Sequence, residues 1–170
     1  MDNSLASAPL LKIENIKQYF YETSGVFFKK EQIVKAVDGV SLEIFPSETL
    51  GLVGESGCGK STLGRSILRL LEPTSGTINY NGEDITSIKK NKMRALRRSM
   101  QIIFQDPYSS LSPRLPVGEI IGEAVREHKI VPEDEFNNYI DEVMENCGLH
   151  SYHKQRYPHE FSGGQRQRIC

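Results

Sequence analysis

A glycine-rich stretch in the first half of the chain has the residue types of a phosphate-binding site. We call it the phosphate loop; it consists of Gly54, Glu55, Ser56, Gly57, Cys58, Gly59, Lys60, Ser61 and Thr62. It fits the pattern G-x-x-x-x-G-K-[ST] without a mismatch. Glycines open backbone conformations that a Cβ forbids, so such a loop turns its N–H groups inward around an anion. The pattern predicts a nucleotide site in which Lys60 reaches the β- and γ-phosphates and Ser61 ligates Mg²⁺.

The elements that must position this loop are also indicated by the sequence. Residues 49–53 form a short apolar run that predicts a buried strand, and an apolar stripe at helical spacing follows the loop. The stripe consists of Leu63, Ile67, Leu70 and Leu71. A chance glycine-rich turn is the alternative interpretation, and the flanking strand and helix disfavour it.

Several further stretches alternate as strands do. Leu11 and Ile13 predict one strand, and residues 40–44 a second. Residues 77–80 and those after Asn81-Gly82 predict a hairpin. Residues 101–104 predict a buried strand that ends in Gln105-Asp106-Pro107, where a polar side chain at a strand end indicates the site. Residues 22–34 have the composition of an exposed excursion.

Three aromatic residues, Tyr19, Phe20 and Tyr21, precede the phosphate loop. One of them could stack on an adenine ring. A place in the sheet core or at its edge is the alternative, and the spacing alone favours that alternative.

The second part of the chain is predicted to be helical. Serines and prolines at 109–116 indicate a linker, and apolar stripes at 121–125 and 136–147 predict two helices with Gly148 at the end of the second. Ser162 is typical of a helix N-cap. The glycines that follow would let a phosphate approach the helix start closely, although a simple loop-to-helix cap is the alternative. We call Ser162, Gly163, Gly164 and Gln165 the signature segment.

Composition excludes several classes of protein. The chain has 170 residues and a net charge of −1, which argues against a general nucleic-acid binder. The cations at residues 89–98 predict a solvated helix face, with a nucleic-acid contact as the alternative. Three scattered cysteines indicate reduced thiols and a cytosolic setting. The four histidines show no metal-ligand spacing, so we expect surface or structural roles for them.

The phosphate loop, Gln105 and the signature segment together resemble the ATP-binding subunit of an ABC transporter. The sequences of residues 35–42, 105–111 and 157–165 are similar to those of the oligopeptide and dipeptide importer branch of this family. The resemblance implies an α/β fold, a P-loop ATPase core with an antiparallel β subdomain and an α-helical subdomain. It implies a core at 1–108, a helical subdomain at 109–161, and the signature segment with the start of its helix at 162–170.

The resemblance also implies roles for residues. The phosphate loop would hold ATP and, through Ser61, Mg²⁺. Gln105 would contact Mg²⁺ and the attacking water and couple the site to the membrane subunits. The signature segment would contact the γ-phosphate of ATP held by a second ATPase subunit, in a head-to-tail homodimer or heterodimer. Phe20, or otherwise Tyr19 or Tyr21, would stack on adenine.

The implied function is an ATPase that powers a peptide importer at the cytoplasmic face of the cell membrane. Its partners would be integral permease subunits and, indirectly, a peptide-binding protein, without nucleic acid. Importers of nickel or another small solute are the first alternative, and soluble ABC-type ATPases of DNA repair or translation are the second. The family's magnesium-ordering Asp, catalytic Glu and switch His have no counterpart up to Cys170. We therefore expect a longer subunit, and expect this stretch alone to bind nucleotide weakly without hydrolysing it.

Overall fold

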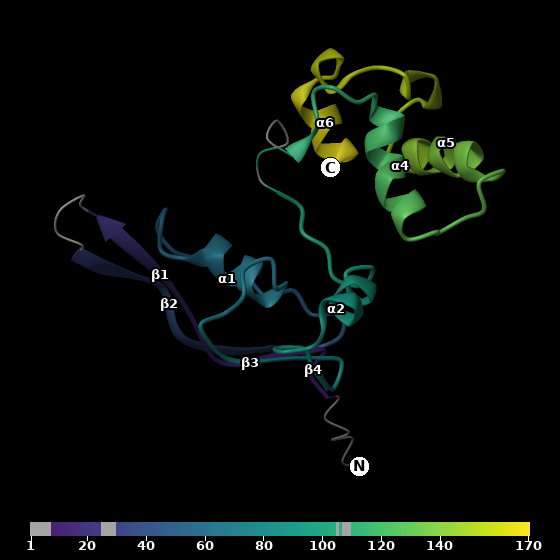
Figure 1. The fold of residues 1–170 in the computed structure, drawn as a ribbon. Helices are drawn as coiled ribbons and strands as arrows, with labels where there is room; N and C mark the ends of the chain where they lie inside the picture. Colours follow the sequence, from purple (N-terminus) through teal and green to yellow (C-terminus); the bar gives the residue numbers. More distant parts are fainter. Residues whose placement is uncertain (1–7, 25–29, 105, 107–109) are drawn as a thin grey trace, which may run out of the picture. The chain divides into compact units, whose positions relative to one another are not determined.

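The computed structural model describes residues 8–24, 30–104, 106 and 110–170, and side chains within the two long strands only up to residue 21 and from residue 32. The chain divides into two compact units, residues 1–101 and 102–170. Figure 1 shows a sheet with short helices in the first unit and only helices in the second.

The first unit contains an antiparallel sheet of four strands in the order β2-β1-β3-β4. The strands are β1 (Leu11–Ser24), β2 (Lys30–Ile44), β3 (Ser75–Tyr80) and β4 (Glu83–Asp84). β1 is central, because Leu11 pairs with Ile44 of β2 on one side and with Tyr80 of β3 on the other. Alternation places the side chains of Ile13 and Ile78 in the core.

Helix α1 (Lys60–Ile67) packs on this sheet, and helix α2 (Lys90–Leu96) follows β4 (Figure 1). Leu63 of α1 is buried among the sheet residues Leu11, Ile13, Ile16, Val37 and Ile78. This cluster fixes the N-terminal end of α1, where the phosphate loop ends. The burial of Leu63 in this cluster thus anchors the helix that follows the loop.

The second unit is helical. It contains α4 (Val117–Glu127), α5 (Phe136–Asn146), the 3₁₀ turns η1 (Ser151–His153) and η2 (Pro158–Glu160), and α6 (Gly163–Ile169). Its core joins Val117 and Val125 of α4 to Ile140 and Met144 of α5 and Ile169 of α6. Val125, Ile140 and Met144 of the predicted stripes therefore pack in this core, whereas Ala124 and Cys147 of those stripes are exposed.

Two predicted features differ from the structure. The predicted strands at 49–53 and 101–104 are not formed, and Val53 is 99% exposed. Within the described residues no strand pairs with either segment, and an isolated strand has no ladder to stabilise it. The predicted exposed excursion at 22–34 includes the ends of β1 and β2, which pair as far as Ser24 and Lys30, and its described side chains, at 32–34, are exposed as predicted.

No helix in the described part of the chain is both long and apolar enough to cross a membrane.

Candidate functional site

The phosphate loop turns sharply before α1. Gly57 has φ +83° and Gly59 has φ +95°, a left-handed region that residues with a Cβ rarely adopt. Gly59 is the N-cap of α1, and Lys60 is the first residue of the helix. The free N–H groups and the positive dipole end of α1 therefore meet at the loop, as the sequence predicted.

The ammonium group of Lys60 is hydrogen-bonded to the backbone of the phosphate loop. Its Nζ donates hydrogen bonds to the carbonyl oxygens of Gly54 at 2.7 Å and Glu55 at 2.6 Å, and lies 3.4 Å from Cys58 Sγ. These carbonyl oxygens are neutral, so they orient the ammonium group without cancelling its charge. The residues present fit the triphosphate of ATP, since an open loop with a central cation is what an anion requires.

Ser61 and Thr62 follow Lys60 in the first turn of α1. Ser61 is exposed and Thr62 is half-buried. A hydroxyl oxygen is a ligand type that Mg²⁺ accepts, so Ser61 is the residue of the loop that fits the metal.

The sheet positions the loop through β2 and β1. A Cβ at Gly59 would lie 2.1 Å from the carbonyl oxygen of Ala36, so the loop backbone lies directly against β2. On the same side, Ser66 Oγ of α1 lies 3.5 Å from Gln18 Oε1 of β1, and both residues are buried. No local sequence pattern predicts either contact, because each joins residues distant in the chain.

The alternation of β1 separates the three candidate aromatic residues. Phe20 lies two residues beyond Gln18, so it is on the face that carries α1, whereas Tyr19 and Tyr21 are on the other face. The hydroxyl of Tyr19 donates to Asp38, and Lys35 Nζ lies 5.3 Å from its ring centroid. Phe20 is 37% exposed. The side chain of Tyr19 is thus engaged by β2 and that of Phe20 is available.

These contacts also shift the pKa values of Tyr19 and Asp38. The hydrogen bond from the tyrosine hydroxyl, helped by Lys35 and Lys17, holds the pKa of Asp38 below its usual value. The same hydrogen bond raises the pKa of Tyr19. Asp38 is therefore ionised and Tyr19 neutral at physiological pH.

The signature segment lies at the start of α6. Ser162 Oγ accepts a hydrogen bond from the Gln165 N–H at 3.3 Å, and Gln165 Oε1 accepts one from the Ser162 N–H at 2.9 Å. This reciprocal capping box confirms Ser162 as the predicted N-cap. Gly163 and Gly164 are exposed, and a Cβ at either would meet no atom within 4 Å. The helix start is therefore bare, as an approaching phosphate requires.

Gln105, predicted to contact Mg²⁺ and water, lies outside the described residues. The phosphate loop and the signature segment belong to different units. The roles predicted for Gln105 and the signature segment therefore stay predictions, as do the predicted domain boundaries.

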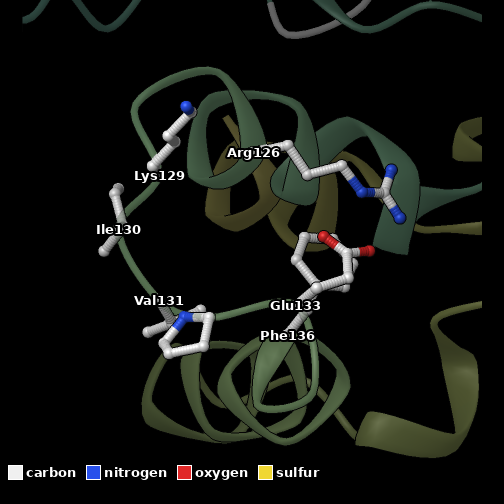
Figure 2. A pocket seen from close by; sticks show the side chains of 7 residues that line it. Arg126, Lys129, Ile130, Val131, Glu133 and Phe136 are labelled. Carbon is white, nitrogen blue, oxygen red and sulfur yellow. The ribbon is translucent and has the colours of Figure 1, made fainter.

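A pocket of about 520 Å³ lies between the end of α4 and the start of α5. Arg126 stacks on the ring of Phe136, 4.0 Å from its centroid, and the side chains of Lys129 and Glu133 lie around them (Figure 2). Arg126 also pairs with Glu119 and lowers the pKa of that carboxyl group. The lining carries two cations, Arg126 and Lys129, and one carboxylate, Glu133. No pattern in the sequence predicts this pocket.

The histidines hold no metal site within the described residues, which contain no group of three or more potential metal ligands. His153 instead packs among rings, with centroids 4.1 Å from Tyr152 and 5.8 Å from Phe161. These contacts agree with the structural role predicted for this residue.

Comparison with known proteins gives one family model, described as ABC transporter, which matches residues 37–170. Two curated relatives come from Bacillus subtilis (strain 168). The oligopeptide transport ATP-binding protein AppF is 48% identical over 94% of this chain and 49% of its own length. The oligopeptide transport ATP-binding protein OppF is 51% identical over 94% of this chain and 51% of its own length.

A third relative, the glutathione import ATP-binding protein GsiA of Escherichia coli (strain K12), is 48% identical over 95% of this chain and 26% of its own length. The chain thus spans about half the length of AppF and OppF and about a quarter of GsiA.

Two solved structures have the same fold. A dimeric post-hydrolysis structure of the ATP-binding cassette MJ0796, bound to ADP and Pi, matches with a TM-score of 0.75 at 24% identity, covering 94% of this chain and 66% of that one. CbiO1 from Clostridium perfringens, part of the ABC transporter complex cbiONQ, matches with a TM-score of 0.69 at 27% identity, covering 95% and 59%. The predicted fold class, an ABC ATPase with antiparallel β and helical subdomains, is confirmed.

Proposed function

The chain belongs to the ABC transporter family, and we propose that the intact protein is the ATP-binding and ATP-hydrolysing subunit of an importer for oligopeptides or dipeptides. The observation that supports the ATPase is the Lys60 ammonium group, held by the carbonyls of Gly54 and Glu55 at the start of α1. The relatives AppF and OppF, named for oligopeptide transport, support the solute class.

In this proposal, the phosphate loop binds the triphosphate of ATP and Lys60 stabilises charge on the β- and γ-phosphates as water attacks the γ-phosphate in line. Ser61 and Gln105 would hold Mg²⁺, which supplies further neutralisation of the phosphates. Phe20 would stack on adenine, because it alone of the three aromatic residues shares the face of β1 with α1. Gln105 would also orient the attacking water.

The signature segment would act on a second molecule. Its exposed glycines and the capping-box residues Ser162 and Gln165 would contact the γ-phosphate of ATP held by the partner ATPase subunit. The subunit would lie at the cytoplasmic face of the cell membrane, bound to integral permease subunits that receive peptide from a binding protein. Nucleic acid has no part in this function.

A glutathione importer is the second candidate, because GsiA is as similar to this chain as AppF is. Glutathione is itself a small peptide, so the two candidates differ in solute and not in mechanism.

The test is ATP hydrolysis by the intact protein, purified with its permease and binding protein in liposomes. We expect hydrolysis to rise on addition of an oligopeptide, and Lys60→Ala to abolish it. Arg65→Ala is the matched control, since Arg65 is an exposed cation on the same helix. Stimulation by glutathione alone would identify the second candidate, and stimulation by Ni²⁺ alone or purification with DNA or ribosomes would overturn the proposal.

A further inference from the structure

Two arginines of α6 hold this helix from opposite sides. Arg166 Nε donates to the carbonyl oxygen of Pro158 at 2.7 Å, and its Nη2 donates to that of His159 at 3.3 Å. Arg168 Nη1 donates to the carbonyl oxygens of Gly148 at 2.7 Å and Cys147 at 3.3 Å. Residues two apart on a helix point about 200° away from each other. The two guanidinium groups therefore contact different neighbours.

The two arginines differ in what they contact. Arg168 is exposed and binds the carbonyl groups that end α5, a usual place for a cation. Arg166 is buried, with 8% of its surface exposed, and binds two carbonyl groups of η2. Burying a guanidinium group costs free energy unless hydrogen bonds compensate. Arg166 thus has the environment of a residue with a specific partner, which is the turn at Pro158 and His159.

That turn leads directly into the signature segment. Phe161 follows η2 and is buried in the helical core, and Ser162 comes next as the N-cap of α6. The Arg166 N–H also donates to the Ser162 carbonyl at 2.9 Å. That backbone bond is the ordinary first bond of the helix, so it is the guanidinium group that joins α6 to η2 across Phe161 and sets their relative orientation.

We propose that Arg166 is a positioning residue for the signature segment. The hydrogen bonds from its guanidinium group to the carbonyl oxygens of Pro158 and His159 hold the start of α6 in place. They thereby set the direction in which Ser162, Gly163 and Gly164 face a partner's nucleotide. The inference rests on the proposed function, because it assigns Arg166 to turnover at the partner's site. The inference gives Arg166 no role in binding ATP at this chain's own phosphate loop.

The experiment compares Arg166→Gln with wild type in the intact protein assembled with its partner subunit. Equilibrium binding of a fluorescent ATP analogue to the isolated subunit reports on the phosphate loop, and we expect its Kd to stay within about 2-fold of wild type. Steady-state kcat of the assembled ATPase reports on the signature segment, and we expect it to fall about 10- to 100-fold, as for a group misplaced by about an ångström.

Two further variants separate positioning from folding. Arg166→Lys keeps the charge but has one ammonium group in place of a planar fork, so we expect unchanged nucleotide binding and an intermediate kcat. Arg168→Gln removes an arginine of the same helix that contacts α5, and we expect kcat near wild type. If Arg166→Gln does not fold, Arg166→Lys carries the test.

Equal kcat in wild type and Arg166→Lys would overturn the inference, and so would an equal loss of kcat in Arg168→Gln or a parallel loss of nucleotide binding in the Arg166 variants. Absence of ATP hydrolysis in wild type would instead overturn the proposed function. The two failures are therefore distinguishable.

Discussion

Gly59 lies against Ala36 so closely that a Cβ on the glycine would be 2.1 Å from the alanine carbonyl oxygen. This approach joins the phosphate loop to β2, and Gly59 also has φ +95°. The loop geometry therefore depends on a contact with a strand more than twenty residues earlier, and on the absence of one methyl group.

Gly59→Ala is expected to abolish ATP binding, because both the clash with Ala36 and the left-handed backbone oppose the loop. Gly57→Ala shares the positive φ but meets no atom within 4 Å, so it should cost about 1–2 kcal/mol of loop stability and weaken binding less. Gly64→Ala, inside α1 with free space around it, should stabilise the helix by about 0.5–1 kcal/mol. Calorimetric titration measures the ATP affinity of each variant, and thermal unfolding measures its stability. An equal loss of ATP affinity in Gly57→Ala and Gly59→Ala would contradict this order.

Phe20→Ala is expected to weaken ATP binding, because base–aromatic stacking contributes about 1–3 kcal/mol. The affinity for inorganic triphosphate should not change, since that ligand has no base. Tyr21→Ala is the matched control, as Tyr21 is the neighbouring aromatic residue on the opposite face of β1. Fluorescence titration with both ligands measures the difference. A larger loss of ATP affinity in Tyr21→Ala than in Phe20→Ala would indicate that Tyr21 is the residue that stacks on adenine.

Local signals in the sequence predicted the features that depend on a few neighbouring residues. Asn81 and Gly82 form the predicted hairpin turn with φ +50° and +80°. Gly148 ends α5 with φ +67°, and the Leu149 N–H donates back to the Met144 carbonyl at 2.8 Å. The pattern of the phosphate loop likewise predicted its turn before a helix. Each of these features is determined by backbone conformation within a few residues.

Features that depend on distant partners were not predictable in this way. The stripe after the phosphate loop predicted a helix to Leu71, but α1 ends at Ile67. Arg69 has φ +49° there, and its Nη1 donates to the carbonyls of Ile85 and Ile88. The Gly59 contact with Ala36 is of the same kind, and the guanidinium group of Arg166 binds carbonyl groups beyond the helix that carries it. Sequence periodicity shows none of them, because their partners lie elsewhere in the chain.

Alkylation of Cys58 is expected to be slowed by ATP. Its thiol is exposed and lies 3.4 Å from Lys60 Nζ, inside the loop that would hold the phosphates. Cys147 and Cys170 are also exposed and lie outside the loop, so they serve as internal controls. Mass spectrometry after timed labelling should show protection at Cys58 only, and Lys60→Ala should remove it. Equal labelling of Cys58 with and without ATP would contradict the phosphate-loop site.

Acid is expected to destabilise the helical unit through His153. Burial among rings, together with Arg156 and His150, lowers the pKa of His153 from its ordinary 6.5, against the opposing effect of Glu160. Among the described residues none donates to or accepts from its Nδ1. As the pH falls, His153 therefore takes up a proton in the unfolded chain at a higher pH than in the folded one. The stability that neutral His153 contributes above pH 6.5 is thus lost as the pH falls through the lower pKa of the folded state. Denaturant midpoints between pH 8 and 5 should fall less in His153→Phe than in wild type, while His128→Gln, outside the ring cluster, should follow wild type.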